Sequence, residues 1–227
     1  MESDTRSVVV PNQTLGETVA AHAAAEKDET PAPARSVNVV FFADCPARGA
    51  VKYRLFWGPL KGAGAPAILP TATDANGLRV SGDAPGLTID NEHYHVQLDP
   101  KSGAILTARL AGRPESEGLF YGTIPIHFGV DVWSPPQGWD HDYNWTSPPN
   151  QKLEKGPLVT RYHRWGPLQD YTDVIVSIAY TFYAHNPYIH ISSTMHLTAD
   201  RSVRAVRMGE IVVAHSHRAQ PNEKDAD

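Results

Sequence analysis

The sequence predicts an all-β protein, an antiparallel β-sandwich preceded by a short β-hairpin unit. Three segments place their large apolar residues on a single face with a period of two: residues 94–98, 174–182 and 189–197. Turn sequences rich in Gly, Pro, Asp and Asn separate the candidate strands. Beyond residue 36 there is no long helical period and no internal repeat. Strands joined by such turns favour antiparallel sheets packed face to face.

The N-terminal residues 1–36 are predicted to form a flexible extension. They are rich in Ala, Pro and charged residues and contain few large apolar side chains. Within them, residues 8–10 favour a short strand and the alanine-rich residues 15–27 favour a short helix. We therefore expect this extension to be removable with little loss of stability.

Residues 37–80 are predicted to be a small β unit followed by a connector. Two strand-like segments, 37–43 and 51–57, flank turn-like residues and predict a hairpin. The chain then becomes rich in Gly, Pro and Ala with little periodicity. This change of composition places a domain boundary near residue 80.

Residues 81–215 are predicted to be the β-sandwich domain. Residues 87–98 and 104–110 flank an Asp-Pro-Lys-Ser-Gly turn and predict a second hairpin. A bulge is expected at Gly209, and residues 216–227 are predicted to be a disordered tail. The remaining expected strands are 121–132, 158–165, 171–183, 188–197 and 204–213.

The second hairpin carries a family resemblance. It contains an Ile-x-Asn-x-x-Tyr-x-Val strand, a Lys-Ser-Gly turn and an Ile-containing return strand: Ile89, Asn91, Tyr94, Val96, Lys101, Ser102, Gly103 and Ile105. This pattern resembles the opening hairpin of galactose-mutarotase-like β-supersandwich domains, which occur in polysaccharide lyases and glycoside hydrolases. Residues 42–58 resemble the last hairpin of the small β domain that precedes such a supersandwich in exo-acting rhamnogalacturonan lyases.

The resemblance covers residues 37–213 and implies a carbohydrate-active protein with a supersandwich-like fold. The usual sandwich of this family is longer, which implies that the chain belongs to a longer parent with further domains. We expect that parent to be secreted or periplasmic, although the acidic N-terminus of this chain has no signal-peptide pattern.

Residues 126–150 combine aromatic and polar side chains in a stretch that four prolines and Gly138 predict to be mostly loop. Flat rings cover the C–H face of a sugar, and polar groups bind its hydroxyls. The substrate-binding candidates are Trp133, Trp139, Trp145, Asp140, Asp142 and Asn144. In the alternative interpretation, the tryptophans plug the end of the sandwich and the aspartates cap turns.

Eliminative cleavage of a uronate needs a cation for the carboxylate, a base for the C5 proton and an acid for the leaving oxygen. His141 or His163 is the candidate base, because an imidazole titrates near neutrality. Tyr143 is the candidate acid, with Tyr162 as a further option. Arg161 or Arg164 is the candidate for a bidentate grip on the carboxylate. In the alternative interpretation, residues 161–164 form an edge strand with solvated charges and one buried tyrosine.

A glycoside hydrolase would instead need two carboxylates across the scissile bond. Asp131, Asp140, Asp142, Asp170 and Asp173 offer such groups, but the sequence does not give their separation. We expect no cofactor. A divalent ion near Asp140, His141 and Asp142 is a less favoured option than ordinary turn and surface roles.

The amino-acid composition limits the classes of binding partner that we expect. The formal net charge is −5 and no block of five basic residues occurs, so we expect no nucleic-acid partner. No apolar run reaches membrane-spanning length, so we expect no membrane partner. A single cysteine excludes an internal disulfide. The expected partner is a polysaccharide or oligosaccharide, with a polysaccharide lyase favoured over a glycoside hydrolase and a non-catalytic glycan-binding or scaffold module as the alternative.

Overall fold

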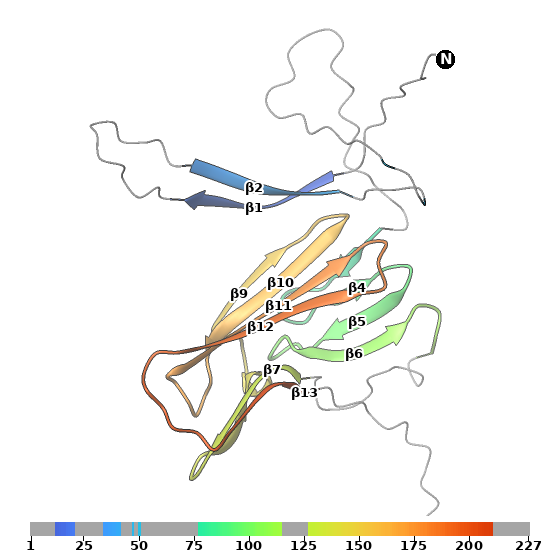
Figure 1. The fold of residues 1–227 in the computed structure, drawn as a ribbon. Coiled ribbons are helices and arrows are strands. Elements are labelled where there is room, and N and C mark those ends of the chain that lie inside the picture. Colours follow the sequence, from blue (N-terminus) through green and yellow to red (C-terminus); the bar gives the residue numbers. More distant parts are fainter. Residues whose placement is uncertain are drawn as a thin grey trace, which may run out of the picture. The chain divides into compact units, whose positions relative to one another are not determined.

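The computed structural model describes residues 12–20, 34–41, 47, 50, 77–114 and 127–210. The chain divides into two units, Met1–Ala75 and Asn76–Asp227, close to the boundary expected near residue 80. The described residues form β-strands and, apart from one short 3-10 turn, no helix (Figure 1). The prediction of an all-β fold is therefore confirmed.

In the first unit, strands β1 (Asn12–Ala20) and β2 (Ala34–Phe41) form an antiparallel ladder that aligns Asn12 with Phe41. The helix expected over residues 15–27 is wrong where β1 covers it. Thr14, Thr18 and Val19 are β-branched and favour a strand, and cross-strand pairing outweighs the helix propensity of alanine. The segments 8–10 and 51–57 lie outside the described residues.

In the described residues of the second unit, the strands form three antiparallel sheets, none of which closes into a barrel. The first sheet has the order β3 (Arg79–Ser81), β4 (Thr88–Asp90), β5 (Tyr94–Leu98) and β6 (Ile105–Leu110). The second has the order β12 (Ile189–Leu197), β11 (Val174–Tyr183), β10 (Val159–Pro167) and β9 (Asn150–Glu154). The third has the order β13 (Ala205–Glu210), β7 (His127–Ser134) and β8 (Gly138–His141).

The first and second sheets enclose the apolar core. The Tyr94 ring of β5 lies 6.4 Å from the Phe182 ring of β11, and both side chains are buried. Asn91 also joins the two sheets, because its amide nitrogen donates to the backbone carbonyls of Tyr183 at 2.8 Å and Asn186 at 3.1 Å. Its amide oxygen accepts from the backbone N–H groups of His93 and Tyr94. The period-two alternation read from the sequence thus corresponds to a real inner face.

The hairpin predicted around the Lys-Ser-Gly turn is present as β5 and β6, but residues 87–98, expected to be one strand, form β4 and β5, which pair antiparallel with each other. The Lys-Ser-Gly turn packs closely on the second sheet at Gly103, where an added Cβ atom would lie 2.5 Å from the Tyr162 hydroxyl. Gly103 also has a φ of +72°, which side-chain-bearing residues rarely adopt. Glycine in the Lys-Ser-Gly turn is therefore required by both backbone conformation and space.

The third sheet is joined to the second through Tyr171. Its hydroxyl donates to the carbonyl of Gly138 at 2.6 Å and accepts from the backbone N–H of Ser134 at 2.8 Å. Strands β7 and β8 both lie within residues 126–150, so the expectation that this stretch is mostly loop is wrong for His127–Ser134 and Gly138–His141. The prolines occupy turns and leave the strands themselves free to pair. The bulge expected at Gly209 is present as a register shift between Met208 and Glu210.

Candidate functional site

A row of four partly exposed aromatic rings follows the β7–β8 hairpin and the turn after it. We call Trp133, Trp139, His141 and Tyr143 the aromatic row. The rings of Trp139 and His141 are 6.2 Å apart and tilted by 16°, and those of His141 and Tyr143 are 4.5 Å apart and tilted by 11°. Trp133 lies 6.3 Å from Trp139 because the two residues pair across the strands. Trp133 is tilted by 38° against Trp139, so the near-parallel rings are those of Trp139, His141 and Tyr143.

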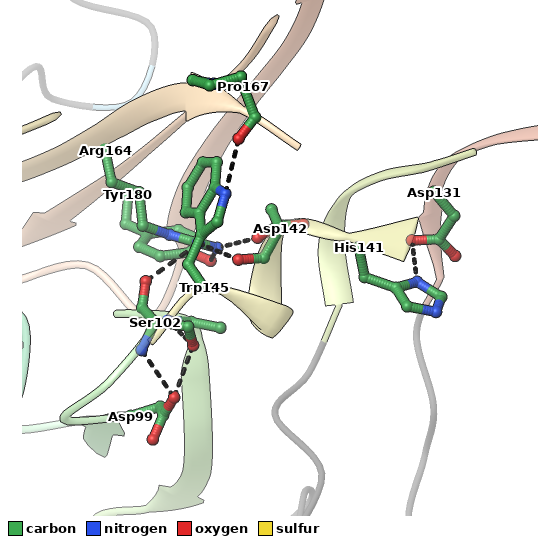
Figure 2. A network of polar contacts seen from close by, with 10 residues as sticks. Asp99, Ser102, Asp131, His141, Asp142, Trp145, Arg164, Pro167 and Tyr180 are labelled. Atoms are coloured by element: carbon green, nitrogen blue, oxygen red, sulfur yellow. Dashed lines mark hydrogen bonds and ion pairs between the residues drawn. The ribbon is translucent and has the colours of Figure 1, made fainter. Parts of the chain in front are cut away.

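The imidazole of His141 is oriented by a buried carboxylate. Its Nδ1 lies 2.8 Å from Oδ1 of Asp131, which is fully buried, whereas the imidazole is 15% exposed (Figure 2). A carboxylate beside Nδ1 favours the tautomer that carries the proton there. The other ring nitrogen, Nε2, is then the acceptor of this imidazole.

Arg207 adds a cation to the aromatic row. Its guanidinium carbon lies 3.9 Å from the centre of the Trp139 ring, and its Nε lies 4.0 Å from Oδ2 of Asp131. Arg207, Asp131 and His141 stand side by side because β13, β7 and β8 pair in that register. Sequence reasoning missed Arg207, since it lies far along the chain and only strand pairing brings it here.

Arg164 and Asp142 are not surface residues. Both side chains are fully buried and form an ion pair between β10 and the 3-10 turn Asp142–Asn144 (Figure 2). Arg164 also donates to the Ser102 carbonyl at 3.1 Å and to the Tyr180 hydroxyl at 3.1 Å. Burial alone lowers the pKa of Arg164, but Tyr180 and Asp142 outweigh it and raise that pKa above its usual value.

This placement corrects two assignments made from the sequence. Arg164 cannot grip a substrate carboxylate, because its guanidinium faces the protein interior. Asp142 cannot contact a sugar, because its carboxylate is enclosed and lies against the backbone of Gly129. Both residues stabilise the junction between the sheets instead.

Asp140 and Trp145 are also structural. Asp140 is fully buried and accepts hydrogen bonds from the backbone N–H groups of His141 at 2.8 Å and Asp170 at 2.6 Å. Trp145 is 3% exposed and donates to the Pro167 carbonyl at 2.9 Å. The turn-capping and plug interpretations therefore hold for these two residues, and their assignment to sugar binding is wrong. Asn144 stays exposed, with its amide donating to Asp140 at 3.1 Å.

His163 and Arg161 lie on the opposite side of the second sheet from His141. Along β10, Arg161, His163 and Trp165 face outward, whereas Tyr162 and Arg164 face the core. Asp142, the residue after His141, contacts Arg164 from the core side. The two candidate bases consequently do not share a cleft.

His163 has its own surroundings on the outer face. Its Nε2 lies 2.7 Å from the Ser177 hydroxyl, and its ring stacks on Trp165 at 4.4 Å. Burial lowers the pKa of His163, and the charges of Arg161 and Lys152 lower it further. Tyr162 is enclosed, and burial raises its pKa, which leaves it a poor candidate for an acid in contact with substrate.

Among the described residues, no group of three or more His, Cys, Asp or Glu side chains is arranged to hold a metal ion. A shallow surface hollow follows residues 197–202, and none of the residues lining it was a candidate from the sequence. The part of the chain that the structure describes contains no helix of the length and apolar character needed to cross a membrane.

The chain matches no protein-family model, no curated protein and no solved structure. The resemblance to galactose-mutarotase-like domains therefore stays a prediction. What the fold and the site define is a class: an antiparallel β-sandwich with an aromatic row beside a buried Asp–His contact.

Proposed function

We propose that this protein is a glycan-binding β-sandwich module that holds a polysaccharide or oligosaccharide on the aromatic row. The observation that carries the proposal is the series of near-parallel, partly exposed rings of Trp139, His141 and Tyr143. Aromatic surface is costly to leave in water, and a sugar would cover the ring surface that Arg207 on Trp139 and the stack of His141 on Tyr143 leave exposed. A row of several rings suits a chain of sugar units better than a single compact ligand.

Polar groups beside the row supply what sugar hydroxyls need. Nε2 of His141 accepts a hydrogen bond in the tautomer that Asp131 favours, and the Tyr143 hydroxyl both donates and accepts. Arg207, which is 39% exposed, brings five donors to the edge of the row. Flat apolar faces and directional polar groups thus lie next to each other along one hairpin.

Binding fits the described residues better than the eliminative cleavage favoured by the sequence. Cleavage by the predicted residues would require one of the two histidines, one of the two arginines and an acidic tyrosine in one cleft. Arg164 lies in the interior, while Arg161 and His163 face away from His141. Hydrolysis fits less well still, because Asp131, Asp140 and Asp142 are fully buried and Asp173 forms an ion pair with Arg201, which leaves Asp170 without a second carboxylate.

Eliminative cleavage of a uronate-containing glycan stays as a second candidate because of one observation. The contact between Asp131 and His141 is an arrangement that prepares an imidazole to accept a proton, and the Tyr143 ring stacks against that imidazole at 4.5 Å. In this version His141 is the base, Tyr143 the acid and Arg207 the cation for the carboxylate. It keeps the predicted base and acid and replaces the predicted arginines by Arg207.

The test is affinity electrophoresis of the full chain in gels that contain polygalacturonate, rhamnogalacturonan, galactan or a β-glucan. We expect retardation by at least one polysaccharide and its loss in Trp139→Ala. Tyr188→Ala is the matched control, because Tyr188 is 73% exposed but lies outside the aromatic row. Equal retardation of both variants, or none with any polysaccharide, would reject the proposal. Ultraviolet absorbance of an unsaturated product would separate cleavage from binding.

A further inference from the structure

The outer face of the second sheet carries a cluster that the aromatic row does not explain. Trp165 and His163 are half-buried on this face, and their rings stack with centres 4.4 Å apart and planes tilted by 26°. The inner side of β10 already supplies the core through Tyr162 and Arg164. The stacked pair on the solvent side is therefore not needed to fill the sandwich interior, and it leaves ring surface in contact with water.

A shelf of small side chains lies beside this stack. Strand register places Ser177 next to Trp165 and Ala179, which is 5% exposed, next to His163; Thr194 and Ser192 lie one strand further away, on β12. No side chain larger than threonine stands on these four positions. These small residues form a low surface that the two rings border on one side. A flat sugar chain can lie on such a surface.

Cations border the other side of the stack. Lys152 of β9 pairs with His163, and its side chain is 60% exposed. Arg161 precedes the pair on β10 and is also exposed. Glu154 is largely covered and lies 3.0 Å from Lys152, so it offsets part of this charge. Burial is the first cause of the lowered pKa of His163; the charges of Arg161 and Lys152 lower it further, and Glu154 opposes them.

We propose that this outer face, centred on Trp165 and His163, is a second binding surface and that it takes an acidic glycan. One sugar ring stacks on Trp165, the chain continues over the shelf of small residues, and a carboxylate lies between Arg161 and Lys152. The contact of Nε2 with the Ser177 hydroxyl at 2.7 Å holds the His163 ring in place, and the ring becomes a further cation as the pH falls. The surface shares no residue with the aromatic row, so it does not rest on the function proposed above.

The test is isothermal titration of the full chain with hexagalacturonate and with its neutral counterpart, galactohexaose. We expect hexagalacturonate to bind more tightly at low salt and to lose this advantage at high salt, because the carboxylate contacts are exposed. The double substitution Lys152→Gln with Arg161→Gln should weaken hexagalacturonate binding about 10-fold and leave galactohexaose binding unchanged. Lys155→Gln is the matched control, since Lys155 is exposed in the loop that follows β9.

A second variant locates the stacking contact. Trp165→Ala should weaken both oligosaccharides about 10-fold at this surface, whereas Trp139→Ala should leave the charge-dependent part of hexagalacturonate binding intact. If Trp165→Ala does not fold, the substitutions at the exposed Lys152 and Arg161 test by themselves whether this surface binds an acidic glycan. Equal affinities for the acidic and neutral probes would overturn the proposal. Full retention of hexagalacturonate affinity in the double variant would also overturn it. Loss of that affinity in Trp139→Ala would overturn it too, because the acidic glycan would then bind on the aromatic row.

Discussion

Arg164 of β10 and Asp142 of the 3-10 turn form an ion pair in which neither side chain is exposed. The Tyr180 hydroxyl and the Ser102 carbonyl accept further hydrogen bonds from the guanidinium, and the Trp145 ring lies 5.4 Å from its central carbon. One cation thus connects the second sheet, the turn after β8 and the hairpin turn of the first sheet. The same contacts remove both charged residues from any role at the surface.

We expect Arg164→Met to lower the free energy of unfolding by about 3–5 kcal/mol, because it leaves the Asp142 carboxylate buried without its partner. Asp142→Asn should also destabilise, since the cation loses its charge partner. The double variant should lose less than the sum of the single losses. Urea unfolding measures all three. Glu154→Gln at the more exposed pair with Lys152 is the control and should cost at most about 1 kcal/mol. Additive losses in the double variant would contradict the pairing.

Two tryptophans of the same hairpin region should respond differently to truncation. Trp145 is buried, so Trp145→Ala should cost about 3–5 kcal/mol through a cavity and a lost hydrogen bond to Pro167. Trp139 is only partly covered, so Trp139→Ala should cost about 1 kcal/mol of stability and weaken glycan binding by about 1–3 kcal/mol. Thermal melting and glycan binding on both variants give the comparison. A large fall in the melting temperature of Trp139→Ala would show that this ring is a plug.

The stability of the fold should decrease below neutral pH through His163. Its pKa is lowered in the folded state, mainly by burial and then by Arg161 and Lys152, with Glu154 opposing them. The unfolded chain, with a pKa of about 6.5, therefore takes up the proton first as the pH falls. The stability contribution is fully present above that pH and is lost as the pH falls toward the lower folded pKa.

His163→Gln removes the titrating group and should make melting temperature less dependent on pH between about pH 8 and 5. The exposed histidines on the neighbouring part of this face are His190 and His196 of β12, so His190→Gln is the control and should keep the original slope. An unchanged slope in His163→Gln would show that other groups carry the acid sensitivity.

At alkaline pH, Tyr94 should give the opposite dependence, in which stability decreases as the pH rises. Burial raises the pKa of Tyr94 to about 12 from its usual value of 10.0. The unfolded state therefore loses the phenol proton first, and the stabilisation present below about pH 10 is lost as the pH rises through about 12. Tyr94→Phe should flatten this part of the stability profile, measured by urea unfolding at a series of alkaline pH values. Tyr188→Phe, at an exposed position, should leave the profile unchanged.

The local sequence pattern was sufficient to predict most strands of the second unit. The alternation in residues 94–98, 174–182 and 189–197 corresponds to strands β5, β11 and β12, because every second side chain of a strand faces the same side. The Lys-Ser-Gly turn and the bulge at Gly209 were predictable for the same reason, since each depends on a few consecutive residues. Strands β8 and β9 were not predicted, because neighbouring prolines suggested loop and only pairing with β7 and β10 makes these residues strands.

The sequence by itself determined the all-β class and the strand over residues 158–165, but it left Arg161 and Arg164 as equal candidates for a surface role. Only the tertiary structure decided which of the two faces the core, because that depends on Asp142, Tyr180 and Ser102 from other elements. It also decided the candidate site. Arg207, Asp131 and His141 come from three strands, and the register of those strands sets their proximity, which no local pattern encodes.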